Sequence, residues 1–135
     1  MPIIIDTDVI IRGERGLFDL PSWLESQAEN NPSIAAITVA ELWHGVERAT
    51  AAHRPRRKAY LEIIRRGLPI LTYTETTAFQ HARLWAELES AGTMIGYYDL
   101  IVAATALEHE STLVTFNRRH FDHVNGLKVV EPKLS

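Results

Sequence analysis

Short apolar runs recur along the chain, and they predict five strands. The first run, Ile3-Ile4-Ile5, ends at the polar residue Asp6, a pattern typical of a buried parallel strand that carries acidic side chains at its carboxyl end. Similar runs follow at intervals that leave room for a helix between most of them. The predicted strands cover residues 2–5, 34–37, 69–71, 112–115 and 128–130.

Between these runs the apolar residues change to helical spacing. Val39, Leu42 and Val46 lie on one helical face after Thr38, and residues 78–88 repeat this spacing before Gly92. The predicted helices cover residues 19–28, 39–49, 54–66, 78–88 and 100–107. Strands that alternate with helices indicate an α/β fold around a mostly parallel sheet. We find no internal repeat or linker, so residues 1–135 are expected to form a single domain.

Composition narrows the possible chemistry. The chain has 135 residues and no cysteine, which excludes disulfides, thiolate zinc sites, iron–sulfur clusters and a cysteine nucleophile. Two acids within the first eight residues do not fit a signal peptide, and no run of eighteen apolar residues predicts a membrane span. We therefore expect a cytoplasmic protein with no membrane contact. The net charge of −3 argues against non-specific coating of nucleic acid.

One segment is nevertheless basic. Seven of the fourteen Lys and Arg residues lie between Arg48 and Arg66, together with a single acid, Glu62. Two interpretations stay open at this point. The segment is either a solvated helix face or a contact surface for a polyanion.

Acidic residues gather where the predicted strands end. Asp6 and Asp8 follow the first strand, Glu41 lies in the helix after the second, and Asp99 opens the helix before the fourth. Asn117 follows the fourth strand. Ligands of parallel sheets bind at this edge, and clustered carboxylates resist ionising together unless a cation shares the site. Oxygen donors without thiolates favour Mg²⁺ or Mn²⁺.

Each acid also has a purely structural interpretation. Thr38 and Glu41 have the spacing of a helix capping box, and Asp99 fits an acid that complements a helix dipole. Asp8 fits a turn. The coincidence of three acids at one predicted edge favours the cation site, because stability does not require it. His120 and His123 have a spacing that can hold a metal on a helix, but we interpret them as surface residues.

Four segments, in the right order, resemble the PIN-domain endoribonucleases, in particular the VapC-type toxins of bacterial toxin–antitoxin pairs. The segments are Ile3-Ile4-Ile5-Asp6-Thr7, residues 40–48 around Glu41, residues 96–106 around Asp99, and residues 113–121 around Asn117 with the tail at 126–130. The resemblance implies a flavodoxin-like PIN fold and metal-dependent cleavage of RNA that inhibits translation and growth. It also implies a homodimer and a VapB-like antitoxin that blocks the site.

The resemblance assigns roles to individual residues. Asp6 and Asp99 are expected to hold Mg²⁺ or Mn²⁺, with Glu41 completing the metal shell or orienting the attacking water. Water as nucleophile leaves 5′-phosphate and 3′-hydroxyl ends. The expected catalytic set is Asp6, Glu41, Asp99, Thr115 and Asn117. Residues expected to position RNA, phosphate or water are Thr7, Asp8, Arg48, Arg54 and Arg118.

Two positions depart from the family pattern. Asp8 stands where the family often has Asn or Ser, and Asn117 stands where many members carry a fourth acid. Either the site holds one metal tightly and a second only with substrate phosphate, or Asp122 supplies the missing acid. The sequence leaves both possibilities open.

Proteins of other classes share parts of this pattern. A PIN-like module that binds RNA or a partner with weak or no catalysis is compatible with Asn117. The Asp6-Thr7-Asp8 motif also matches haloacid-dehalogenase-type phosphatases, but the acidic pair that they need after a downstream lysine does not follow Lys128 or Lys133. A receiver domain would need a phosphoacceptor aspartate after Leu71, and the sequence has none there. A metal-free ribonuclease would need two histidines together with a lysine, and no such group is indicated.

Overall fold

The computed structural model describes residues 1–133, which contain five parallel strands. These are β1 (Ile3–Ile5), β2 (Ile34–Ala35), β3 (Ile70–Leu71), β4 (Thr112–Val114) and β5 (Val129–Val130). β1 pairs with β4, β4 with β5, and β2 with β3. An isolated bridge between Ile4 and Ser33 joins the two pieces, so the order is β3-β2-β1-β4-β5. The five predicted strands and the parallel α/β sheet are confirmed, except that the strand predicted at 34–37 ends at Ala35, because Ala36 and Ile37 already belong to the following helix.

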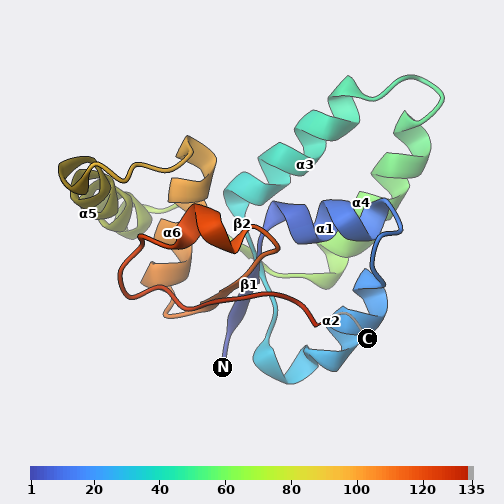
Figure 1. The fold of residues 1–135 in the computed structure, drawn as a ribbon. Helices are drawn as coiled ribbons and strands as arrows, with labels where there is room; N and C mark the ends of the chain where they lie inside the picture. Colours follow the sequence, from blue (N-terminus) through green and yellow to red (C-terminus); the bar gives the residue numbers. More distant parts are fainter. Residues whose placement is uncertain (134–135) are drawn as a thin grey trace.

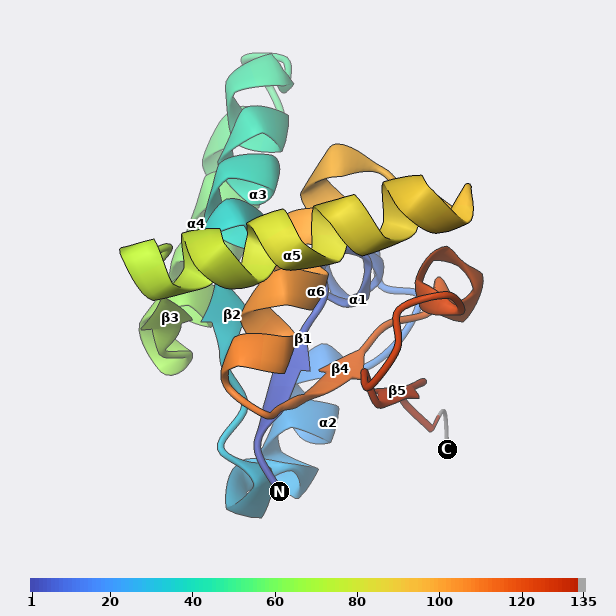
Figure 2. The same cartoon turned by 90° about the vertical axis from the view of Figure 1, so that its left-hand side faces the viewer.

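Six helices surround the strands (Figure 1). They are α1 (Thr7–Glu14), α2 (Leu20–Ser26), α3 (Ala36–Arg48), α4 (Arg54–Gly67), α5 (Glu75–Ala91) and α6 (Tyr97–Glu108). Two 3₁₀ turns, η1 (Ala28–Asn30) and η2 (Arg118–Phe121), complete the described elements. In Figure 2, α5 and α6 lie on the near side of β1 and β4. None of the helices in residues 1–133 is long and apolar enough to cross a membrane.

The strand β1 lies between two apolar layers. Ile3 and Ile5 point into a core built with α1 to α4, while Ile4 points into a second core built with α5, α6 and η2. This alternation follows from the two-residue period of a strand. Because both faces are covered by helices, β1 is apolar at every position, and the first polar side chain that it can present is Asp6 at its end.

The start of α3 corrects one prediction. The helix begins at Ala36, three residues before the predicted start at 39, and Ala35 precedes it without a side-chain cap. Thr38 is therefore a buried residue inside the first turn, and the predicted capping box with Glu41 is wrong. A reciprocal capping box is instead present between Thr74 and Thr77 at the start of α5.

The helix α1 was absent from the predicted elements, because it begins directly after β1. Asp6 forms its N-cap by accepting a hydrogen bond from the backbone N–H of Thr7 at 2.9 Å. Asp8 consequently lies in the first helical turn and not in a loop turn. The two acids are thus held by helix geometry.

Arginines from the basic segment join α3 to its neighbours. The Arg54 guanidinium donates to the backbone carbonyls of Val46, Glu47 and Ala49 at the end of α3. Arg57 donates to the carbonyl of Gly45 and forms an ion pair with Glu14 at 3.0 Å. Arg54 therefore satisfies the free carbonyls at a helix end, a structural role that the sequence did not predict, and its role in RNA contact stays a prediction.

The packing of α1 against α2 predicts a stability difference between two glycines. A Cβ atom at Gly13 would lie 2.5 Å from Leu20 Cβ, whereas a Cβ at Gly67 would have no neighbour within 4 Å. We expect Gly13→Ala to lower the free energy of unfolding by about 1–3 kcal/mol, as overpacked sites do. Gly67→Ala, the matched control, should leave it unchanged or raise it. Urea denaturation of both variants tests this, and equal stabilities would contradict the described packing.

Candidate active site

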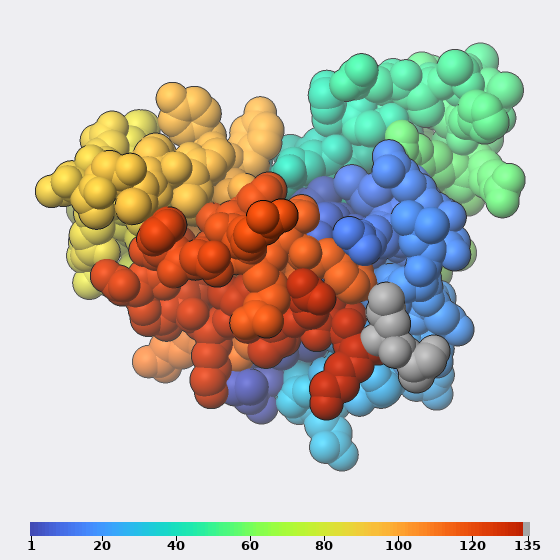
Figure 3. Space-filling view, in the orientation of Figure 1, coloured from blue at the N-terminus to red at the C-terminus, as the bar shows by residue number. Residues whose placement is uncertain are grey.

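The amino ends of three helices meet beyond the carboxyl end of β1. Asp6 ends β1 and caps α1, Glu41 lies in α3, and Asp99 lies in the first turn of α6. Figure 3 shows the notch in the upper outline, between the yellow-to-orange arm of α5 and α6 and the turquoise-to-green arm of α3 and α4. The structure therefore brings together the three acids that the sequence placed at one edge.

Asp6 is the most enclosed of these acids, with 5% of its surface exposed. Its Oδ1 accepts the N–H of Thr7, and its Oδ2 lies 2.9 Å from the hydroxyl of Thr115, which is fully buried at the end of β4. The same hydroxyl lies 3.2 Å from Asp8 Oδ1 and accepts the N–H of Asn117. Thr115 thus holds Asp6 and Asp8 together, and its single hydroxyl hydrogen serves one carboxylate at a time.

Asp8 is tied to the segment that follows β4. Its Oδ2 accepts the backbone N–H of Phe116 at 2.9 Å, a contact that no local sequence pattern predicts. Phe116 also lies under the Arg12 guanidinium, 4.3 Å from its ring centroid. These contacts give Asp8 a structural task, which is to hold α1 against the exit of β4.

Glu41 is positioned by two threonines. The hydroxyl of Thr7 lies 2.7 Å from Glu41 Oε1 and 3.3 Å from the hydroxyl of Thr38. Because Thr7 follows Asp6 directly, this contact links the glutamate of α3 to the aspartate of β1. Thr7 therefore links two of the acids, a role that the sequence did not predict, and Thr38 supports Thr7 through its hydroxyl.

Asp99 is paired with a histidine. The Nδ1 atom of His120, in η2, lies 3.0 Å from Asp99 Oδ2. His120 is exposed, as the sequence predicted, but it also contacts one of the acids. Asn117 precedes η2 with an exposed side chain, and Asp122 follows η2, also exposed. Arg118 is exposed in η2, and Arg48 lies in the last turn of α3, seven residues after Glu41 and so on a similar helical face.

Burial disfavours the charged form of all four acids. Burial raises the pKa of Asp6 to about 7, and repulsion from Asp8 and, more weakly, Asp99 adds to this, against the hydrogen bonds from Thr115 and Thr7. Burial likewise raises the pKa of Asp8, Glu41 and Asp99. Repulsion from Asp99 and Asp8 further raises the pKa of Glu41. The site therefore carries negative charge that the surrounding residues compensate only in part.

This donor set fits a hard divalent cation that keeps part of its water. Within residues 1–133, no three His, Asp or Glu side chains are close enough to enclose an ion by themselves. Mg²⁺ commonly binds through one or two carboxylates plus water and substrate phosphates, so a loose group of carboxylates suits it. A cation bound there would also relieve the mutual repulsion that raises the pKa of Asp6.

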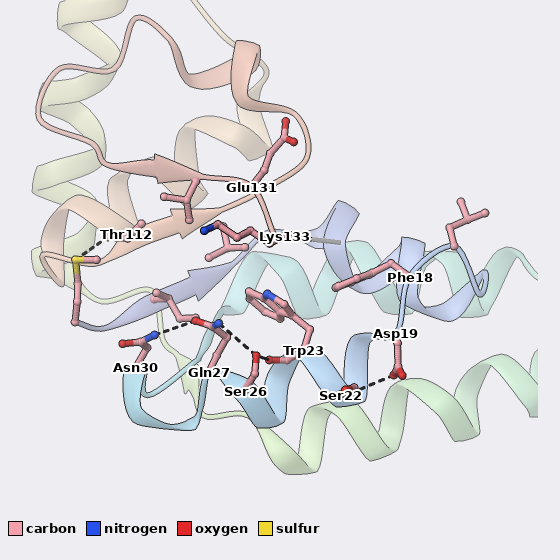
Figure 4. A pocket seen from close by; sticks show the side chains of 15 residues that line it. Phe18, Asp19, Ser22, Trp23, Ser26, Gln27, Asn30, Thr112, Glu131 and Lys133 are labelled. Atoms are coloured by element: carbon pink, nitrogen blue, oxygen red, sulfur yellow. Dashed lines mark hydrogen bonds between the residues drawn. The ribbon is translucent and has the colours of Figure 1, made fainter. Parts of the chain in front are cut away.

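A separate cavity lies at the amino ends of β1 and β4. It has a volume of about 800 Å³ and is lined by residues from α2, including Trp23, and by Met1, Ile3 and Thr112 at the amino ends of β1 and β4 (Figure 4). None of the four acids lines this cavity. The acids therefore lie at the opposite ends of the strands from this cavity.

Comparison with known proteins gives a consistent match. The PIN domain family model matches residues 3–127. The chain is 33% identical to Ribonuclease VapC1 of Rickettsia felis over 132 residues, 96% of each chain. It is 32% identical to the tRNA(fMet)-specific endonuclease VapC of Salmonella typhimurium over 96 residues, 71% of each chain. The crystal structure of VapBC2 from R. felis, bound to a DNA fragment from their promoter, superposes with a TM-score of 0.90 and 27% identity, covering 98% of this chain and 100% of that one.

The raised pKa of Asp6 predicts how stability depends on pH without divalent cations. The folded protein keeps a proton on Asp6 up to about pH 7, whereas the unfolded chain releases it near the ordinary value of 3.8. Between these values the folded state binds more protons, so its stability falls as pH rises. Asp6→Asn removes this titration and keeps an acceptor for Thr7. In EDTA, we expect the melting temperature of the variant to exceed that of wild type by a margin that grows from pH 5 to pH 8. A constant difference would contradict the burial of an ionisable Asp6.

Proposed function

This chain belongs to the PIN domain family, and from that premise we propose that it is a divalent-metal-dependent endoribonuclease acting as the toxin of a toxin–antitoxin pair. The observation that carries the proposal is the gathering of Asp6, Glu41 and Asp99 at the carboxyl end of β1, where the pKa of each carboxyl is raised. The match to the PIN domain family excludes the phosphatase and receiver-domain alternatives.

We assign the roles as follows. Asp6 and Asp99 hold a Mg²⁺ or Mn²⁺ ion, which when bound lowers the pKa of water and neutralises charge on the scissile phosphate. Glu41, held by Thr7, orients the attacking water or completes the shell. Thr115 fixes the rotamer of Asp6 through its 2.9 Å contact. Asn117, exposed beside η2, offers an amide that can hydrogen-bond to phosphate or water.

The partners follow from the relatives. One structural neighbour is VapBC2 from Rickettsia felis, bound to a DNA fragment from their promoter, so we propose a VapB-like antitoxin as the cognate partner. The homodimer of this chain is proposed on the family resemblance alone. The relative from Salmonella typhimurium is named a tRNA(fMet)-specific endonuclease. For this chain we propose RNA as the substrate, and the cleavage assay below identifies which RNA it is.

Cleavage of RNA tests the proposal. We expect the purified, antitoxin-free protein to cut one or a few species in total RNA with Mg²⁺ or Mn²⁺, leaving 5′-phosphate ends. EDTA should abolish cutting, and Asp99→Asn should reduce it by about 100-fold or more, because an electrostatic contact at the reacting phosphate is lost. Glu87→Gln makes the same charge change on the exposed surface of α5 and should have no effect.

Two outcomes would contradict the assignment. Cleavage that survives EDTA, or that leaves cyclic phosphates, would rule out water activated by a bound cation. Mn²⁺ binding without cleavage of any RNA would instead favour a PIN-like binding module.

The position of Arg48 predicts a role in binding the RNA backbone. We expect Arg48→Ala, made in the Asp99→Asn background so that RNA stays intact, to weaken binding and lower the slope of log affinity against log salt by about 1. Arg66→Ala is the matched control, because Arg66 ends α4 just before β3, away from the acids, and lies near Glu62. Equal slopes for the two variants in filter-binding titrations would show that Arg48 makes no phosphate contact.

A further inference from the structure

One contact at the site has no part in the roles assigned above. His120 Nδ1 lies 3.0 Å from Asp99 Oδ2, although 21 residues separate the two in the sequence. The carboxylate of Asp99 has two oxygens, and this contact engages only one of them. His120 therefore lies next to a proposed metal ligand but is not itself proposed to bind the metal.

The turn that carries His120 is firmly anchored. Its neighbour Phe121 is 2% exposed and packs in the core with α5 and α6. The backbone N–H of His120 donates to the carbonyl of Asn117 at 3.0 Å, and the N–H of Asn117 donates to the buried hydroxyl of Thr115. The backbone of His120 is thus fixed through the residue that also contacts Asp6, so its ring is presented to Asp99 by the fold.

We propose that His120 is a positioning residue for Asp99: its Nδ1–H donates to Oδ2, fixes the carboxylate plane and leaves Oδ1 for the cation. The proposal rests on the proposed cation site and adds a specific residue to it. Such pairs between an imidazole and a carboxylate orient ligands in metal sites. The bond also fixes which ring nitrogen carries the hydrogen.

The arrangement also bears on the missing fourth acid. Asn117 stands where many family members carry an acid, and η2 brings a hydrogen-bond donor to Asp99 from the same segment. A donor in this place restrains one carboxylate without adding to the repulsion that, together with burial, raises the pKa of Asp6 and Glu41. The opposite possibility is that His120 merely fills the space of the cation and competes with it.

The hydrogen position is measured directly by NMR of ¹⁵N-labelled histidines in the metal-free protein near pH 8. We expect His120 to carry its hydrogen on Nδ1 in wild type and to lose this preference in Asp99→Ala. His123, exposed three residues later, is the internal reference and should not respond to Asp99→Ala. A hydrogen on Nε2 of His120 in wild type would overturn the proposal.

The second measurement is Mn²⁺ affinity by calorimetry. His120→Leu keeps bulk but lacks a donor, and we expect it to weaken Mn²⁺ binding by about 10-fold or more. His120→Asn retains an amide N–H close to the Nδ1 position and should restore most of the affinity. His123→Leu is the matched control and should bind as wild type does. Melting temperatures without metal should agree among the His120 variants, because the side chain is partly exposed.

The outcomes separate the two proposals. Equal Mn²⁺ affinity in wild type and His120→Leu overturns the positioning role alone, and tighter binding in His120→Leu shows that the histidine competes with the cation. Failure of wild type to bind Mn²⁺ overturns the proposed metal-dependent function, and the positioning role with it.

Discussion

Electrostatic repulsion among the carboxylates beyond β1 is the constraint on which the site depends. Asp6 is nearly fully buried beside Asp8, and Asp99 and Glu41 add charge from two further helices. Burial of like charges is unfavourable unless hydrogen bonds or a cation offset it. The chain provides part of this offset through the N–H groups of Thr7 and Phe116 and the hydroxyl of Thr115. A cation can offset the remaining repulsion, so the repulsion that destabilises the metal-free protein favours metal binding.

The rest of the fold serves to hold these groups in place. Because β1 is covered on both faces, two apolar cores hold the strand in place, and the position of Asp6 at its end is fixed with it. The arm formed by α3 and α4 is secured by Arg54 and Arg57, which bind carbonyl groups near the end of α3. Four of the seven basic residues in the segment therefore make structural contacts, since Arg65 and Arg66 also pair with Glu62. Among the other three, Arg48 is the candidate for contact with the RNA backbone, because it shares α3 with Glu41.

The sequence predicted the strands and the three acids because both depend on local pattern. Strands buried on both faces are continuous apolar runs, and the acids follow directly where the apolar requirement ends. The helix α1 was missed because it begins at Thr7 with no intervening loop, so Asp6 is at once the end of a strand and a helix cap. Thr38 and Glu41 have the spacing of a capping box, but in the folded protein the Thr38 hydroxyl contacts Thr7 instead. The pairing of His120 with Asp99 depends on tertiary structure, so the sequence predicted the exposed position of His120 but not this contact.

Anomalous scattering from crystals grown with Mn²⁺ tests most directly whether the acids form one cation site. The electrostatics of the site require a peak in contact with the carboxylates of Asp6 and Asp99, with Glu41 bound to it directly or through a water molecule. A peak elsewhere, or none at all under conditions in which the protein cleaves RNA, would show that the carboxylates do not act by holding a metal ion.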